Sequence, residues 1–141
     1  MKILNAKLKN YSVYWVKNEN FPVIKSNHGS SALGLAIFGL KDCDLERLDF
    51  YEGSFGYELR KVNILLENKE ILSYNDEDEA YVYFNFDEET EVGKDWSLDE
   101  WQLHYGLISR LVAKEYMTLQ SRLGEIDLLS EYKQIYDRLS L

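Results

Sequence analysis

Hydrophobic and polar residues alternate with a period of two over much of the first 95 positions, which is typical of β-strands. Residues 3–17 fit two strands joined near Lys9 and Asn10. Extended structure resumes at Phe21, because Pro22 disfavours helix in the residue that precedes it. The chain is therefore expected to begin with short strands.

A polar loop is expected at residues 26–31 (SNHGSS), and the run that follows, residues 31–40 (SALGLAIFGL), is almost wholly apolar. A short apolar run of this kind predicts a strand buried on both faces, inside a small barrel or a covered sheet.

The middle of the chain predicts three further strands, at residues 57–66, 71–74 and 80–86 (AYVYFNF), with a hairpin turn at 67–70. Residues 75–79 (NDEDE) have the charge of a calcium loop but lack its central glycine and its spaced terminal glutamate. We therefore expect a solvated turn there.

Helical patterns occur in two places. A short helix is predicted at residues 42–52, capped by Asp42 or Asp44. Ser97 and Glu100 form a capping box that starts a second helix, with a break at Gly124. An apolar stripe at helical spacing follows this box: Trp101, Tyr105, Ile108, Leu111, Val112, Glu115 and Leu119. A last helix has inward positions at Ile126, Leu129, Tyr132, Ile135, Tyr136 and Leu139.

Together these patterns predict an α+β fold: a small mixed, β-barrel-like sheet with one short helix and two C-terminal helices. Residues 1–141 are expected to form one domain, with a β-rich part at 1–95 and a helical part at 96–141. A length of 141 residues and a hydrophobic content of 45% suffice for one ordinary core.

Charge and composition exclude several classes of function. The net charge of −9 repels phosphate backbones, and the basic residues form no stripe, so we expect no nucleic-acid partner. No apolar run is long enough to span a membrane. The single cysteine cannot form an internal disulfide, and no hydrophobic leader follows Met1, so a cytoplasmic location is expected. No metal or cofactor motif is present, and none is expected to bind.

Glu52 is the candidate for acid-base chemistry. On a helical period it shares one face with Leu45, Leu48 and Asp49, so a carboxylate lies among apolar anchors. Two interpretations fit: desolvation raises the pKa of Glu52 and makes it a proton shuttle, or the helix ends in a glycine cap and Glu52 bonds the loop amides.

Several short motifs in a fixed order bear on this choice. They are LDFYEG (residues 48–53), FGY (55–57) and AYVYF (80–84), followed by WSL (96–98) and Trp101. This order resembles the gamma-glutamylcyclotransferase-like family, also called avirulence-induced-gene-like. It is most similar to the domain that precedes the Nudix domain in tellurite-resistance B type ADP-ribose pyrophosphatases.

The resemblance implies an activity and a set of site residues. The family cyclises a gamma-glutamyl group to 5-oxoproline and releases an amine. Glu52 matches the family's catalytic glutamate, which takes a proton from the attacking amine and returns one to the leaving amine. Tyr83 matches a pocket tyrosine, and Gly53 and Tyr57 are expected to bind substrate beside it.

One departure keeps other interpretations open. Family members open with a strand and a tyrosine-glycine-threonine-leucine loop that holds the substrate's carboxylate, and this motif is absent here. Without the strand that carries this motif, one edge of the sheet is exposed. A second copy of the chain is expected to cover that edge, giving a homodimer. The alternatives are therefore a non-catalytic domain that binds a small molecule or a partner, and a shortened relative of the Nudix-fused protein.

Overall fold

The fold is that of a computed structural model, which describes residues 1–53, 55–68, 70–85, 89–121 and 128–140. The strands are β1 (Lys2–Val16), β2 (Pro22–Phe38), β3 (Tyr57–Asn68), β4 (Ser73–Asn85) and β5 (Val92–Asp95). The helices are α1 (Asp42–Gly53), α2 (Leu98–Trp101), the π-helical turn η1 (Gln102–Gly106), α3 (Leu107–Tyr116), the 3₁₀ turn η2 (Met117–Ser121) and α4 (Leu128–Leu139).

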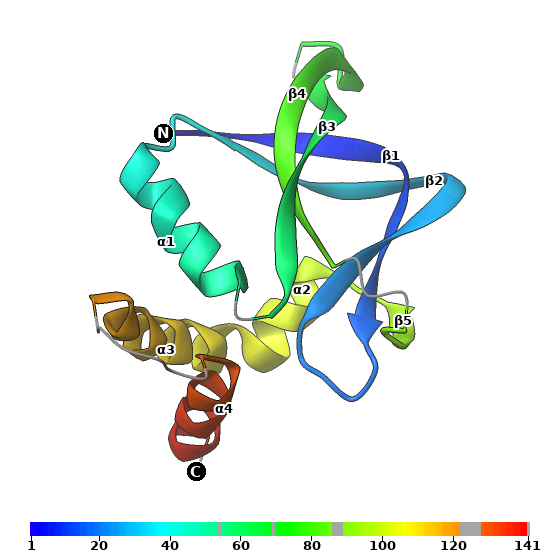
Figure 1. The fold of residues 1–141 in the computed structure, drawn as a ribbon. Helices are drawn as coiled ribbons and strands as arrows, with labels where there is room; N and C mark the ends of the chain where they lie inside the picture. Colours follow the sequence, from blue (N-terminus) through cyan, green and yellow to red (C-terminus); the bar gives the residue numbers. More distant parts are fainter. Residues whose placement is uncertain (54, 69, 86–88, 122–127, 141) are drawn as a thin grey trace.

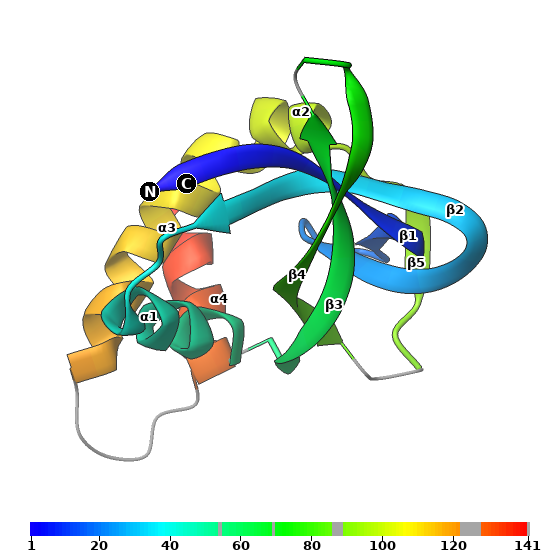
Figure 2. The same cartoon turned by 90° about the horizontal axis from the view of Figure 1, so that it is seen from above.

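The sheet has the order β2-β1-β3-β4, and β5 pairs with β1. The prediction of an α+β fold is confirmed, but the described strand pairs are antiparallel rather than mixed. Short hairpin connections join β1 to β2 and β3 to β4, and such connections permit only antiparallel neighbours. The β3–β4 hairpin crosses the β1–β2 hairpin, and α1, α3 and α4 lie together to one side of the strands (Figures 1 and 2).

Two hydrophobic clusters stabilise this arrangement. The first lies between the strands and contains Ala6, Leu8, Ala32, Ile64, Leu66 and Phe84. The second lies among the helices and contains Val112, Tyr116, Leu119, Tyr132 and Ile135. Phe50 and Tyr51 of α1 pack against the second cluster. No helix in the described part of the chain is long and apolar enough to cross a membrane.

The first two strands are longer than the sequence predicted. β1 is a single strand, and a register shift between Lys9 and Tyr11 replaces the expected turn at Lys9 and Asn10. Asn10 has a φ of 68°, and its Oδ1 accepts a hydrogen bond of 3.2 Å from the amide of Gly29 on β2. The predicted turn is thus a bulge, which bends the strand without ending it.

The polar loop expected at residues 26–31 is also part of a strand. Its residues belong to β2, where Ser26 and Ser31 pair with Tyr11 and Lys9 of β1, and residues 27–30 lie at the register shift between these two pairs. Asn27 Nδ2 donates to Ser12 Oγ at 3.0 Å and to Tyr14 Oη at 3.2 Å. Polar partners on β1 thus satisfy the side chain of Asn27, whereas Ser26, His28 and Ser31 are exposed, as the sequence pattern predicted.

The apolar run of β2 is not buried on both faces. Ala32 is buried, but Leu33, Leu35 and Ile37 are 66%, 55% and 49% exposed. β2 is an edge strand, and these three side chains line an open trough between β2, β4 and α1. The expected homodimer stays a prediction, and this stripe is where a second copy would meet the sheet.

Residues 75–79, expected as a solvated turn, lie in the middle of β4. They pair with β3, with Glu79 opposite Asn63 and Glu77 opposite Leu65. An exposed ion pair of 2.9 Å joins Glu79 to Lys61 on the neighbouring strand. The backbone ladder accommodates this acidic segment because its carboxylates reach solvent on both sides.

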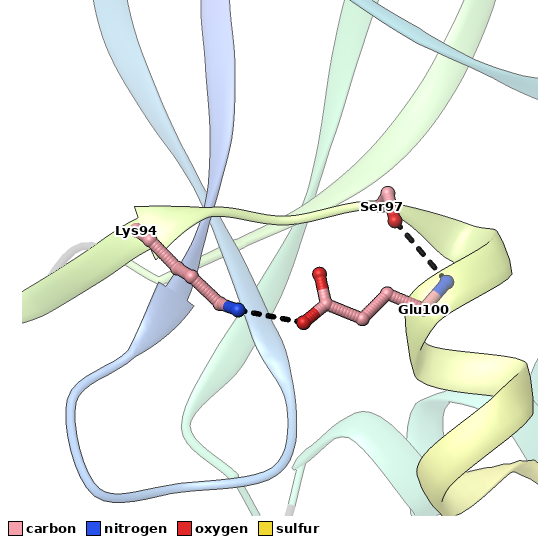
Figure 3. Close-up of polar contacts among 3 residues, drawn as sticks. All are labelled: Lys94, Ser97 and Glu100. Carbon is pink, nitrogen blue, oxygen red and sulfur yellow. Dashed lines mark hydrogen bonds and ion pairs between the residues drawn. The ribbon is translucent and has the colours of Figure 1, made fainter.

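The helical half begins at the predicted capping residue. Ser97 Oγ accepts a hydrogen bond of 3.1 Å from the amide of Glu100, which caps the N-terminus of α2 (Figure 3). The carboxylate of Glu100 turns toward β5, where Lys94 Nζ lies 2.6 Å away (Figure 3). The Ser97 half of the predicted capping box is confirmed. The Glu100 carboxylate, expected to accept from the Ser97 amide, instead ties the helix to Lys94 of the preceding strand among the described contacts.

Replacing Ser97 with alanine is expected to lower the free energy of unfolding by about 1 kcal/mol, because one amide at the start of α2 loses its acceptor. Lys94→Ala, which removes only an exposed ion pair, should cost less than about 0.5 kcal/mol. Urea unfolding of the two variants checks this order, and an equal loss in both would contradict the capping role.

The apolar stripe of the long helical stretch is only partly as predicted. Val112 and Leu119 are buried, but Leu111 is 45% exposed, and Tyr116, outside the predicted stripe, is fully buried. The π-helical turn η1 has one residue more than a regular α-helical turn, so the side chains of α3 are rotated about the helix axis relative to a continuous α-helix. α4 is confirmed, with Tyr132 and Ile135 buried, whereas the predicted break at Gly124 and the inward position at Ile126 lie outside the described residues.

Candidate functional site

The C-terminal end of α1 lies beside the start of β3 (Figures 1 and 2). Here Glu52, the residue before the end of α1, lines a cavity of about 380 Å³. The other described lining residues are Asn20, Phe21, Pro22, Val23, Ile24, Tyr51, Phe55, Tyr57, Tyr83, Trp96, Leu98, Trp101, Ser109 and Tyr132. Strands and helices that are distant in sequence thus converge on one carboxylate.

Glu52 is half-buried, and within the described residues its carboxylate makes no hydrogen bond or ion pair. Burial raises the pKa of Glu52 from 4.5 to about 7. A carboxyl group with this pKa exchanges a proton readily near neutral pH. Both interpretations of Glu52 stay predictions, and the burial of its carboxylate fits the proton shuttle.

Glu52 also lines a second, larger cavity of about 570 Å³, an apolar trough between β2, β4 and α1. Leu45 and Leu48 form part of its wall, so the α1 face expected from the sequence does point toward the sheet. Both leucines stay partly exposed, and Asp49 is exposed, because the trough is open. Glu52 and Tyr83 line both cavities.

Tyr57 and Tyr83, the two tyrosines expected at the site, are brought together with Glu52. Tyr57 Oη donates a hydrogen bond of 2.6 Å to the carbonyl oxygen of Pro22. The hydroxyl of Tyr83 donates to the carboxylate of Asp49 on α1. Burial raises the pKa of both tyrosines above the ordinary value, so both hydroxyls stay protonated at neutral pH.

The two glycines near Glu52 differ in their roles. Gly53 ends α1, is exposed, and is outside the described lining of both cavities. Gly56 has a φ of +75°, which favours glycine, and it lets the chain turn from α1 into β3. The expected binding role of Gly53 therefore stays a prediction.

The cavity wall contains a group of aromatic residues that the sequence reasoning did not assign to the site. The ring centroids of Phe55 and Tyr132 are 4.8 Å apart, and those of Tyr51 and Phe55 are 5.5 Å apart. The hydroxyls of Tyr51 and Tyr132 share a hydrogen bond of 3.3 Å. A content of 14% aromatic residues hinted at such a wall, but their spacing along the chain does not reveal it.

The cavity has acid-base character rather than the features of a metal centre. Within the ranges that the structure describes, no three His, Cys, Asp or Glu side chains come together as metal ligands. The chemistry available at this point is proton transfer by Glu52 and shaping of a ligand by aromatic rings.

The raised pKa of Glu52 predicts that stability falls as pH rises. The folded state binds the proton more tightly than the unfolded chain, so the stabilisation is complete below about pH 4.5 and is lost through about pH 7. One pKa unit is worth 1.36 kcal/mol, so the loss over the shift from 4.5 to about 7 is at most about 3.4 kcal/mol. Urea unfolding between pH 5 and pH 8 should show this dependence in the wild type. This pH dependence should be much weaker in Glu52→Gln, and equal pH profiles of the two proteins would contradict the prediction.

These features define a class: a small α+β domain with one half-buried carboxylate, without a partner among the described residues, in an aromatic cavity. The chain belongs to the AIG2-like gamma-glutamyl cyclotransferase family, whose model, "Gamma-glutamyl cyclotransferase, AIG2-like", matches residues 2–103. The match includes the strands, α1 and the start of the helical half.

Among curated proteins, the chain is similar to Protein AIG2 B of Arabidopsis thaliana. The two are 32% identical over 97 residues, which cover 69% of this chain and 54% of that protein. The chain thus spans about half the length of this relative.

Two solution structures of Arabidopsis thaliana proteins have a similar fold. One has a TM-score of 0.58 at 20% identity, and the match covers 87% of this chain and 79% of the Arabidopsis chain. The other has a TM-score of 0.55 at 19% identity and covers 89% of this chain and 78% of its own. At these identities the likeness concerns the fold alone.

Proposed function

We propose that this protein is a gamma-glutamyl cyclotransferase that converts a gamma-glutamyl amine into 5-oxoproline and a free amine. The observation that carries the proposal is Glu52, a half-buried carboxylate without a described partner at the junction of two cavities. Membership of the cyclotransferase family supports the reaction class.

In the proposed reaction Glu52 acts first as a base and then as an acid. Its carboxylate takes a proton from the substrate's α-ammonium group, and the freed amine attacks the γ-carbonyl carbon. A new C–N bond closes the five-membered lactam, and the original C–N bond breaks. Glu52 gives this first proton to the leaving nitrogen, then takes the second proton from the ring nitrogen and passes it to the released amine, so both transferred protons of the ammonium group leave with the amine and no external acid or base is consumed.

The surrounding residues are proposed to position the substrate. The hydrogen bonds from Tyr57 to Pro22 and from Tyr83 to Asp49 hold both rings as fixed walls, which restricts the substrate to few orientations. A Cβ on Gly53 would meet nothing within 4 Å, so the backbone beside Glu52 is open to a small ligand.

The direct test is 5-oxoproline release from a panel of gamma-glutamyl amines and dipeptides, with Glu52→Gln as the blank. Release by the wild type that is lost in the variant supports the proposal. No release from any member of the panel would overturn it.

A second candidate is a non-catalytic domain that binds a small molecule or a partner. It is favoured by one observation, the absence of the family's tyrosine-glycine-threonine-leucine motif, which leaves the substrate carboxylate without its usual backbone donors. Saturable binding of a gamma-glutamyl amine without product would favour this candidate.

The finer likeness to the domain fused to Nudix enzymes stays a prediction, as does a cytoplasmic location. If the chain is a shortened relative of such a protein, it should not hydrolyse ADP-ribose, because no Nudix motif is present.

A further inference from the structure

The outer face of the long helical stretch carries three exposed leucines. α2, η1 and α3 follow one another without a break from Leu98 to Tyr116 (Figure 1). Leu103, Leu107 and Leu111 lie four residues apart along this stretch and are 79%, 66% and 45% exposed. Side chains at this spacing are neighbours on one face of a helix. These three residues are called the leucine row below.

The leucine row belongs neither to the core nor to the candidate site. A different side of α3 buries Val112 and Tyr116 in the second hydrophobic cluster. The three leucines are also outside the described lining of both cavities that Glu52 lines. A contiguous apolar patch on a helix surface that serves neither purpose marks a surface for association.

Charges of opposite sign flank the two ends of the leucine row. Asp99 precedes the row, in the first turn of α2, and Arg110 and Lys114 lie beside its far end. All three side chains are exposed, and none of them has an ion-pair partner among the described residues. The face is therefore negative at its N-terminal end and positive at its C-terminal end.

This distribution of charge complements itself when two copies of the helix run antiparallel. A two-fold axis at Leu107 places this residue against its own counterpart and Leu103 against Leu111 of the second copy. The same axis places Asp99 near Lys114 of the second copy, whereas a parallel pair would bring like charges together. The opposite charges orient the pair, and the leucines supply apolar surface to bury.

Charge also favours this face over the sheet edge for self-association. The net charge of the chain is −9, so two copies repel each other on average. The trough beside β2 is lined by Glu52 and Glu79 and borders the acidic residues 76–79 of β4. The leucine row instead has two cations and one acid without a described partner beside it, so a second copy meets no net negative charge there.

We infer that the leucine row is the contact surface of a homodimer, in which two copies of the helical stretch 98–116 pack antiparallel about an axis near Leu107. The inference concerns assembly and does not depend on the proposed reaction. It places the second copy on the helices rather than on the edge of β2. One pair of helices buries less than a standard interface of roughly 800 Å² per partner, so a weak dimer is expected, with a Kd on the order of 10 µM.

Sedimentation velocity of the full chain between about 1 µM and about 500 µM tests the contact. The wild type should shift from monomer to dimer over this range. Leu107→Glu, which sets two carboxylates against each other at the axis, should weaken association by at least roughly 30-fold. Leu33→Glu on β2 is the matched control, because Leu33 is also 66% exposed, and it should dimerise like the wild type.

Two results would overturn the inference. One is a wild type that stays monomeric over the whole range, which would leave the leucine row to a different partner. The other is a dimer that is lost in Leu33→Glu but kept in Leu107→Glu, which would place the second copy at the sheet edge. Urea unfolding of both variants checks that each is folded.

An exchange of charges tests the orientation of the two helices. Lys114→Glu places an acid near Asp99 of the second copy and should weaken the dimer roughly tenfold, as should Asp99→Lys, which brings two cations together. The double variant restores opposite charges, so its Kd should return to within about threefold of the wild-type value. Additive losses in the double variant would contradict the antiparallel pair. All of these readouts are independent of 5-oxoproline release, so a failure of the proposed function leaves the test intact.

Discussion

Replacing Glu52 with glutamine is expected to lower kcat for 5-oxoproline release by roughly 10²- to 10⁴-fold while the protein stays folded. Glutamine has nearly the same shape as glutamate but cannot accept or return a proton. Because no described residue bonds the carboxylate of Glu52, the substitution leaves no buried partner unsatisfied. Steady-state kinetics with a gamma-glutamyl amine measure the loss.

The control lies on the same helix. Glu46 of α1 is exposed and outside the described lining of both cavities, so Glu46→Gln should leave the rate unchanged. The wild-type kcat/KM should rise with pH with an apparent pKa of about 7, as Glu52 loses its proton. An active Glu52→Gln variant with the wild-type pH profile would show that Glu52 takes no part in proton transfer.

Replacing Tyr116 with alanine is expected to lower the free energy of unfolding by about 3–5 kcal/mol, the usual cost of removing a large buried ring. Tyr116 is fully buried, and its ring centroid lies 5.1 Å from that of Phe50 and 5.5 Å from that of Tyr132. Its hydroxyl donates to the carbonyl oxygen of Phe50 at 3.3 Å. The residue thus joins α1 to α3 and α4, and its loss should also reduce 5-oxoproline release by loosening the helix that carries Glu52.

The matched variant is Leu111→Ala on the same helix. Leu111 belongs to the apolar stripe predicted from the sequence, but it is 45% exposed. Its truncation should cost less than about 1 kcal/mol, because much of its side chain is already in water. Urea unfolding measures the loss of stability in Tyr116→Ala and in Leu111→Ala. A larger loss in Leu111→Ala would contradict the burial pattern that we attribute to the π-helical turn η1.

Features governed by neighbouring residues were predicted well. The span of α1, the cap at Ser97 and the strand over residues 80–85 depend on residues within one turn or one strand. The errors concern segments whose state depends on distant partners. Residues 26–31 and 75–79 look like loops by composition, yet both lie within strands. β3 offers a backbone ladder beside 75–79, and β1 pairs with Ser26 and Ser31 on the two sides of a register shift.

The residues of the candidate site also divide into those predicted from local sequence and those that only the fold brings together. Glu52, Tyr57 and Tyr83 were identified from short motifs, and all three line one cavity. Phe55, Trp96 and Tyr132 complete the wall, but they come from separate parts of the chain. Only packing brings their rings together, because no local period relates them.

The sequence by itself determined the α+β class, the candidate acid-base residue and the family to compare it with, since these depend on local patterns and short motifs. The tertiary structure decided the environment of Glu52. Its carboxylate is half-buried and has no described partner, so its pKa is raised to about 7. The described residues that line the smaller cavity include no cation. Desolvation and charge balance are sums over neighbours in space, and those neighbours are set by the fold rather than by position along the chain.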